Sequence, residues 1–302
     1  MHIGLQIQSF KYPGGTTAIQ PTLKEIVTTA EQAGFYSLWV MDHFYQIKGL
    51  YGDVKGLSGE AYTDPMLECY TTLGYLAGVT EKLFLGALVT GAIYRHPSVL
   101  MKTVTTLDIL AGGRAYFGIG AGWYEDEAKG YGIPYPSTAE RFELLEDTLK
   151  LAKALWSGGD EISFAGKHVV APAITNNPRP LSTPHPRIMI GGTGPNKTLR
   201  MVAQYADACN IGYWVGPENM QKALDTLKGH CEALGRDYDT IEKTVACTVH
   251  LSGEDTVESA IHRIKELSGM GFTHAIVQMP DVYTITPLET FANEIIPAVA
   301  DL

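Results

Sequence analysis

An aspartate and a histidine stand side by side at the end of a short apolar run, in Met41-Asp42-His43-Phe44. Histidine titrates near neutral pH, so it can give a proton to a substrate or take one from it. The alternative is a histidine that bonds the backbone and packs beneath the following loop. The neighbouring carboxylate favours chemistry, and we predict that Asp42 and His43 form a proton-handling pair.

A second candidate is the glycine-rich run Gly118-Ile119-Gly120-Ala121-Gly122-Trp123. Its alternating glycines resemble a dinucleotide-binding fingerprint, but that motif follows the first strand of its domain and opens a helix at once. A long segment rich in tyrosine, glycine and proline follows here instead. We interpret Gly120 and Gly122 as room for a ring system, with Trp123 as a wall beside it.

A third candidate is Ile190-Gly191-Gly192-Thr193-Gly194-Pro195, which runs into a predicted helix carrying Lys197 and Arg200. Backbone N–H groups at a helix N-terminus attract phosphate. The sequence therefore predicts an anion site at Gly191, Gly192, Thr193 and Gly194, although a simple strand-to-helix turn would have the same composition. The segment Asn210-Ile211-Gly212-Tyr213 could close the other side of that pocket through Ile211 and Gly212.

Composition excludes several functional classes. The net charge is −10, which opposes binding to a nucleic-acid backbone, and no apolar run approaches the length of a membrane span. Neither H-E-x-x-H nor G-x-S-x-G occurs, so neither a metal site nor a serine hydrolase is predicted. We expect a cytoplasmic protein with four reduced thiols, namely Cys69, Cys209, Cys231 and Cys247.

The elements that must position these residues alternate in type. Apolar, β-rich runs predict eight strands, namely Ile3–Ile7, Ser37–Met41, Leu83–Val89, Ala115–Ile119, Arg187–Ile190, Ala208–Gly212, Thr244–Val249 and Ala275–Gln278. Helical patterns lie between and after them, at about Pro21–Ala33, Asp64–Ala77, Pro97–Leu110, Thr138–Leu155, Pro195–Tyr205, Pro217–Leu234, Val257–Ser268 and Leu288–Val299. Eight such units in 302 residues predict one α/β domain over residues 1–302, a (β/α)8 TIM-type barrel, in preference to an open sheet.

Start and stop signals support several of the helices. Ser137-Thr138-Ala139-Glu140 is a capping box, and a helix can begin at Pro65, Pro97, Pro195 or Pro217. Two regions interrupt the alternation of strands and helices. Tyr45–Thr63 is an extended loop after the second strand, and Gly158–Pro186 is an insertion after the fourth helix. Because a barrel's active face lies at the carboxyl ends of its strands, we expect the first to shape the site.

Several of these stretches in this order resemble the luciferase-like flavin and deazaflavin oxidoreductases, over nearly the whole chain. The resemblance is carried by Ser37–Phe44, Gly118–Glu127, Gly132-Ile133-Pro134 with Glu140-Arg141-Phe142, and Asn177–Pro180 through Gly194 to Asp207. Within that group the chain is most similar to enzymes that use the deazaflavin coenzyme F420. An FMN-dependent monooxygenase is the alternative on the same scaffold, and a barrel that binds its cofactor without catalysis is another.

The resemblance implies a homodimeric TIM-type barrel that transfers a hydride between the deazaflavin C5 and a small organic substrate. It places Asp42 and His43 beside the ring, with His43 as proton donor or acceptor, and a cis peptide at Leu88–Val89 behind it. It also assigns Gly191, Gly192, Thr193, Gly194, Ile211 and Gly212 to the phosphate pocket.

The chain departs from one branch of that group at two positions. Members that oxidise glucose 6-phosphate carry a glutamate where Trp123 stands, and the position of their active-site tryptophan corresponds to Ile47. The resemblance therefore implies an apolar or aromatic acceptor, or a pterin, in preference to a sugar phosphate.

Overall fold

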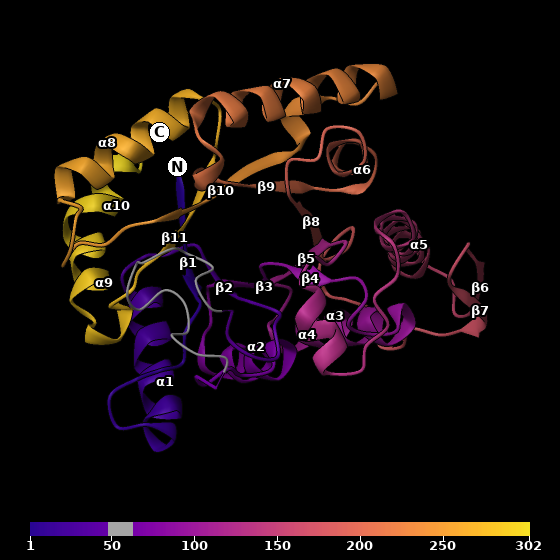
Figure 1. Cartoon of the computed structure of the whole chain (residues 1–302), viewed down its shortest axis with the longest axis horizontal. Helices are drawn as coiled ribbons and strands as arrows, with labels where there is room; N and C mark the ends of the chain where they lie inside the picture. The colour runs from indigo at the N-terminus through magenta and orange to yellow at the C-terminus, as the bar shows by residue number, and fades with distance from the viewer. Residues whose placement is uncertain (48–62) are drawn as a thin grey trace.

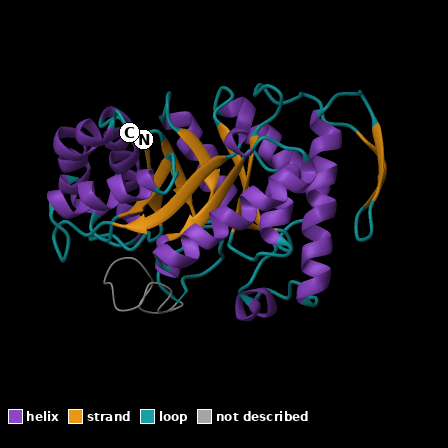
Figure 2. Cartoon of the chain, turned by 90° about the horizontal axis from the view of Figure 1, so that it is seen from above, coloured by secondary structure: helices purple, strands orange, loops and turns teal. Residues whose placement is uncertain are grey.

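The centre of the molecule is a closed ring of parallel strands surrounded by helices (Figures 1 and 2). The computed structural model describes residues 1–47 and 63–302. The ring runs β3-β2-β1-β11-β10-β9-β8-β5, and pairing of β3 with β5 closes it. Its strands are β1 (His2–Ile7), β2 (Ser37–Val40), β3 (Phe84–Ala87), β5 (Ala115–Gly120), β8 (Arg187–Gly191), β9 (Ala208–Gly212), β10 (Glu242–Thr248) and β11 (His274–Gln278). The predicted TIM-type barrel is confirmed.

The helices pack around the outside of this ring. They are α1 (Thr16–Gln32), α2 (Cys69–Val79), α3 (Pro97–Leu110), α4 (Glu125–Gly130), α5 (Thr138–Trp156), α6 (Thr198–Tyr205), α7 (Pro217–Leu234), α8 (Val257–Gly269), α9 (Thr286–Thr290) and α10 (Ile296–Val299). The predicted capping box starts α5, because Ser137 and Glu140 bond each other's backbone N–H groups. Within the described ranges, no helix is long and apolar enough to cross a membrane.

Some predicted helix boundaries are wrong. Proline starts α3 and α7 as predicted, but α2 begins at Cys69, because the Glu68 side chain accepts a hydrogen bond from the Thr71 N–H. The helix predicted from Pro195 begins three residues later. The last predicted helix is divided into α9, a π-helical turn at Phe291–Ile295, and α10. The short helix α4 was not predicted.

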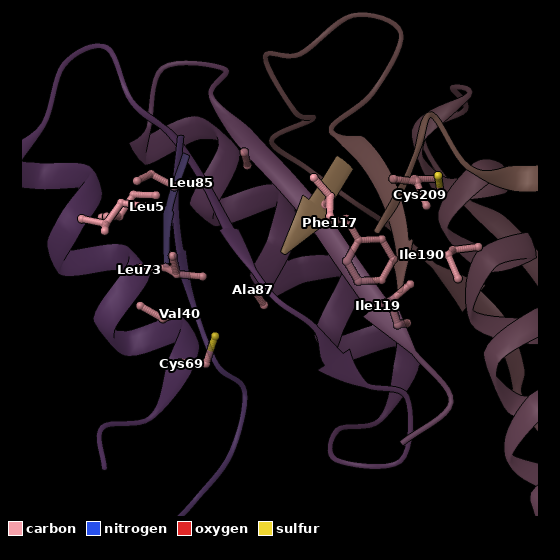
Figure 3. Close-up of a cluster of buried hydrophobic side chains, with 14 of the residues drawn as sticks. Leu5, Val40, Cys69, Leu73, Leu85, Ala87, Phe117, Ile119, Ile190 and Cys209 are labelled. Carbon is pink, nitrogen blue, oxygen red and sulfur yellow. The ribbon is translucent and has the colours of Figure 1, made fainter. Parts of the chain in front are cut away.

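Side chains alternate between the two faces of the ring. Those pointing outward pack against the helices in one large buried cluster, and Figure 3 shows Leu73 and Cys69 of α2 near the strand residue Val40. A smaller cluster, comprising Trp39, Tyr116, Met189, Ala208 and Ile276, is formed by strand residues whose side chains are fully buried. We infer that this second cluster fills the barrel interior, as inward-facing layers do in such barrels.

A buried polar network lies beside the second cluster. Ser37 Oγ and His274 Nε2 are 2.8 Å apart, and His274 Nδ1 lies 2.9 Å from a Glu242 oxygen. The Trp39 indole donates to the same hydroxyl at 2.7 Å. Although serine, histidine and glutamate are connected as in a hydrolase triad, Ser37 and His274 are fully buried, so we assign this network to structure.

The insertion after α5 contains an antiparallel hairpin that the sequence did not predict. It comprises β6 (Ile162–Ala165) and β7 (Val170–Ile174), and it lies to one side of the barrel (Figure 2). The segment that follows is held by Asp108 of α3, whose buried carboxylate accepts hydrogen bonds from the backbone of Leu181 and Ser182. The described part of the insertion is therefore a packed structure and not an open loop.

One glycine in β5 is required by the close approach of its neighbour. A Cβ on Gly118 would lie 2.0 Å from the Ala87 carbonyl oxygen. We expect Gly118→Ala to lower the free energy of unfolding by about 3 kcal/mol or more, because backbone has to move. The control is Gly74→Ala in α2, where nothing lies within 4 Å and alanine favours the helix. Equal denaturation midpoints for the two variants would contradict this account.

Candidate functional site

A cavity of about 920 Å3 opens at the carboxyl ends of the strands, the face where barrel sites form. Its walls come from most of the strands and from the loops that follow them. The predicted site residues that line it are His43, Leu88, Val89, Gly120, Gly122, Gly191 and Gly192. The predicted residues that do not line it are Asp42, Thr193, Gly194, Ile211 and Gly212.

His43 is held in the cavity wall by a carboxylate that was not predicted to touch it. Its Nδ1 lies 2.8 Å from Glu127 Oε2, and the histidine side chain is 10% exposed. Tyr94, which also lines the cavity, donates its hydroxyl to the same oxygen at 2.6 Å. The other carboxylate oxygen accepts the Phe44 N–H at 2.6 Å. Because Nδ1 is bonded to Glu127, the ring nitrogen that remains for a substrate is Nε2.

The short helix α4 explains why Glu127 reaches inward. Its first turn contains Glu125, Asp126 and Glu127, of which the first two are exposed and the third is fully buried. The sequence analysis did not single out Glu127 as a site residue. No local signal separates Glu127 from its neighbours, because the side chains that it contacts, His43 and Tyr94, lie 84 and 33 positions away in the chain.

Asp42 has a different partner from the one predicted. It is fully buried, and its carboxylate takes a bidentate pair of hydrogen bonds from Arg95 at 2.6 and 2.9 Å. Arg95 also bonds Glu68. Burial alone would lower the pKa of Arg95, but hydrogen bonds to Asp42 and Glu68 raise it above its usual range, so Arg95 stays a cation. The predicted Asp42–His43 pair is therefore wrong: adjacent residues have separate partners.

The Arg95 ion-pair cluster supports the backbone beside the cavity. The guanidinium lies 4.9 Å from the centre of the Tyr70 ring, and the Tyr70 hydroxyl bonds Thr90 at 2.8 Å. Thr90 is the first residue of β4 (Thr90–Gly91), which pairs with β5. The peptide between Leu88 and Val89 comes directly before β4. That peptide is cis, as the resemblance implied. Asp42 therefore does not line the cavity itself. It is connected to the cavity wall through Arg95 and Tyr70.

The glycines after β5 and β8 make room for protein atoms. A Cβ on Gly120 or on Gly191 would lie 3.2 Å from the Val89 side chain. Gly122 has a φ of 81°, a conformation that side chains other than glycine rarely adopt, and a Cβ there would meet Ile93. Gly120 and Gly122 do line the cavity, so their role beside a ligand ring stays a prediction.

Aromatic side chains surround the mouth of the cavity. Trp123 is 56% exposed and Trp214 is 67% exposed, and both line the cavity. Trp123 stacks on Tyr124 and meets the His43 ring edge-on with centroids 5.9 Å apart. The predicted role of Trp123 as a wall matches this position. Ile47 is buried and does not line the cavity, and residues 48–62 of the predicted Tyr45–Thr63 loop lie outside the described residues.

The predicted anion site forms an exposed turn at the edge of the cavity. Gly192 has a φ of 116° and donates its N–H to the Asn210 carbonyl, so that N–H is already used. Gly194 is exposed, and the buried Thr198 at the start of α6 lines the cavity. Thr193 and Gly194 could therefore contact only the part of a ligand that extends out of the cavity. Nowhere in residues 1–47 and 63–302 do three or more His, Cys, Asp or Glu side chains gather as metal ligands would.

The buried carboxylate predicts how acid affects stability. Burial alone would raise the pKa of Glu127, but hydrogen bonds from His43, Tyr94 and Phe44 hold it below the ordinary 4.5. A carboxyl group with a lower pKa when folded stabilises the protein fully above its unfolded-state pKa, and this contribution is lost as pH falls through its folded-state pKa.

We therefore expect the difference in free energy of unfolding between the wild type and Glu127→Gln to shrink as pH falls below 4.5. Urea titrations across this range measure it. Glu125→Gln, which changes an exposed carboxylate of the same helix, is the matched control and should show little difference at any pH. A difference for Glu127→Gln that stays constant down to pH 3 would contradict the prediction.

Comparison with known proteins places the chain in a family. A family model described as luciferase-like monooxygenase matches residues 1–285. The chain belongs to the luciferase-like monooxygenase family.

Two proteins with similar sequences are named as redox enzymes. An F420-dependent glucose-6-phosphate dehydrogenase of Kineococcus radiotolerans is 26% identical over 284 residues, which cover 90% of this chain and 77% of that protein. A phthiodiolone/phenolphthiodiolone dimycocerosates ketoreductase of Mycobacterium tuberculosis is 30% identical over 256 residues, covering 82% of this chain and 66% of that protein. Together with the family, these relatives support an oxidoreductase activity for this chain.

A solved structure shares the fold of this chain. The coenzyme F420-dependent tetrahydromethanopterin reductase of Methanopyrus kandleri superposes with a TM-score of 0.77 at 18% identity, and the match covers 98% of each chain. At that identity the likeness supports the fold alone.

Proposed function

We propose that this protein is an F420-dependent oxidoreductase that transfers a hydride between its cofactor and a small, uncharged organic substrate. The observation that carries the proposal is the His43–Glu127 contact in the cavity wall, which leaves one histidine nitrogen for proton exchange. The F420-dependent relative supports the choice of cofactor. An FMN-dependent monooxygenase on the same scaffold is the alternative.

The residues around the cavity fit a tricyclic ring with a phosphate-bearing tail. About 920 Å3 exceeds what one ring system needs and leaves space for a substrate beside it. Met41, Leu88 and Val89 would supply apolar contact, and Gln6 and Gln278, which bond each other at 2.8 Å, would supply amide groups. Thr193 and Gly194 would meet the phosphate outside the cavity. Bound F420 would supply a carbon centre that accepts or releases a hydride.

The protein's own part is to orient its ligands and to move a proton. His43 Nε2 would exchange the proton that accompanies the hydride, while Glu127 fixes the ring and stabilises its charged form. Tyr94 and the Phe44 N–H fix Glu127 in turn. Trp123, at the mouth of the cavity, would cover the bound cofactor ring and limit access of water.

The charge of the cavity supports an uncharged substrate. Among the described lining residues Arg263 is the only lysine or arginine, and its guanidinium is already paired with Asp255. Trp123 and Trp214 offer flat apolar surfaces at the mouth. An alcohol, an imine or an activated alkene with an apolar or aromatic body therefore suits the site better than a sugar phosphate. The ketoreductase relative is consistent with such a substrate.

Anaerobic absorbance measurements test the proposal. Reduced F420 should be oxidised when a suitable ketone, imine or activated alkene is added, and oxidised F420 should be reduced by a matching alcohol. In a separate aerobic assay, turnover with reduced FMN and oxygen, together with no turnover with F420, would support the monooxygenase instead. The homodimer and the cytoplasmic location remain predictions, and light scattering of the purified protein tests the first.

A further inference from the structure

We propose that Lys153 is a site of covalent acylation by acyl phosphates, with His185 as the base that accepts the amine proton. Lys153 lies in the last turn of α5, and His185 precedes β8. Neither residue lines the cavity. His185 and its neighbour Asp207 stand before the amino ends of β8 and β9, the side of the barrel opposite the cavity.

Hydrogen bonds fix the form of the His185 ring. Its Nδ1 lies 2.9 Å from the Pro186 carbonyl oxygen, which can only accept, so Nδ1 carries the proton. Nε2 therefore presents a lone pair, and Lys153 Nζ lies 2.8 Å from it. Asp207 lies 3.7 Å from Nδ1, on the far side of the ring. The imidazole and the amine are thus in direct contact, whereas Asp207 is too far from the ring for a hydrogen bond and accepts the Ile188 N–H instead.

The surroundings favour a reactive amine. Trp156 stacks on His185 with centroids 5.8 Å apart, and the histidine side chain is 9% exposed, so the imidazole is held in one orientation. Burial lowers the pKa of Lys153, with Arg236 adding to the effect and Asp207 opposing it. Within the described part of the chain Lys153 forms no ion pair, whereas Lys150, one turn earlier, pairs with Glu146. Lys153 itself is partly exposed, so a small acyl donor can reach it.

The reaction requires no further component. The neutral amine of Lys153 attacks the acyl carbonyl carbon, forming a C–N bond, and the C–O bond to phosphate breaks as phosphate leaves with the electron pair. The amine proton passes to His185 Nε2. The product is a neutral amide in place of a cation, and nothing is oxidised or reduced.

The test is acetylation of the purified protein by acetyl phosphate, followed by mass spectrometry of peptides that separate Lys153 from Lys150. At pH 7.5 we expect Lys153 to react roughly 10-fold faster than Lys150, less than the 10²–10⁴-fold that a positioned base contributes in enzymes. Equal rates at pH 7.5 would overturn the proposal.

His185→Asn separates the role of the base from exposure alone. Asparagine can still donate to the Pro186 carbonyl but has no atom at the position of Nε2. We expect the Lys153 rate to fall to that of Lys150, with the Lys150 rate unchanged as an internal control. An unchanged Lys153 rate in folded His185→Asn would also overturn the proposal. Neither measurement uses F420 or a substrate, so both are independent of the proposed redox function.

Discussion

Replacing His43 with alanine should lower kcat/KM by roughly 10²–10⁴-fold, the usual contribution of a general acid or base. His43 lines the cavity, and its Nδ1 is already bonded to Glu127. Removing the ring removes the one group we assign to proton exchange. Affinity for F420 should change much less, because the residues proposed to hold the phosphate lie on another loop. Steady-state assays and fluorescence titrations measure the two effects separately.

A second variant distinguishes proton transfer from loss of structure. His43→Asn keeps a donor that can bond Glu127 and lacks only the outer nitrogen. The kcat/KM of His43→Asn should fall by a factor similar to that of His43→Ala, while the variant retains the wild-type melting temperature. His262→Ala, which changes an exposed histidine on α8, is the control and should keep full activity. Unchanged turnover in His43→Asn would show that Nε2 does not carry the proton.

Glu127→Gln should lower kcat by roughly 10²-fold with a smaller change in KM. The amide can still accept a hydrogen bond from His43, but it provides no negative charge for the imidazolium form that proton exchange requires. It also weakens the contacts from Tyr94 and Phe44, so the ring loses part of its fixed orientation. Because the substrate does not touch Glu127 in this account, binding should change less than turnover.

Glu125→Gln is the matched control, since it makes the same chemical change on the exposed side of α4, where Glu125 pairs with Lys129. It should retain wild-type kcat and KM. A rise in KM with kcat unchanged in Glu127→Gln would indicate that the carboxylate contributes to binding and not to the proton step.

The barrel was predictable because its signal is repeated. Runs such as Ile3–Ile7 and Ala275–Gln278 are mostly apolar, as is typical of parallel strands covered on both faces, and eight such runs alternate with helical patterns. The capping box at Ser137 and the C-terminal glycine at Gly235 act within a few residues. Local signals of this kind are read directly from the sequence.

The partners of the site residues were not predictable, because they depend on contacts far apart in the chain. His43 and Glu127 are 84 positions apart, and Asp42 and Arg95 are 53 apart. β2 ends at Val40, before Asp42 and His43, and nothing in the local sequence shows that these two adjacent side chains bond different partners. Gly120 is a further example. A glycine at this position indicates that another group comes close, but the sequence does not show that this group is the Val89 side chain.

The most direct test of the central claim is a fluorescence titration of the purified protein with F420 and, separately, with FMN. The account predicts saturable F420 binding that is much tighter than FMN binding, with His43→Ala binding F420 nearly as tightly as the wild type. Tight binding of FMN together with weak binding of F420 would contradict the proposed cofactor and support an oxygen-dependent monooxygenase. Binding of neither would contradict the assignment of the cavity to a flavin-like ring.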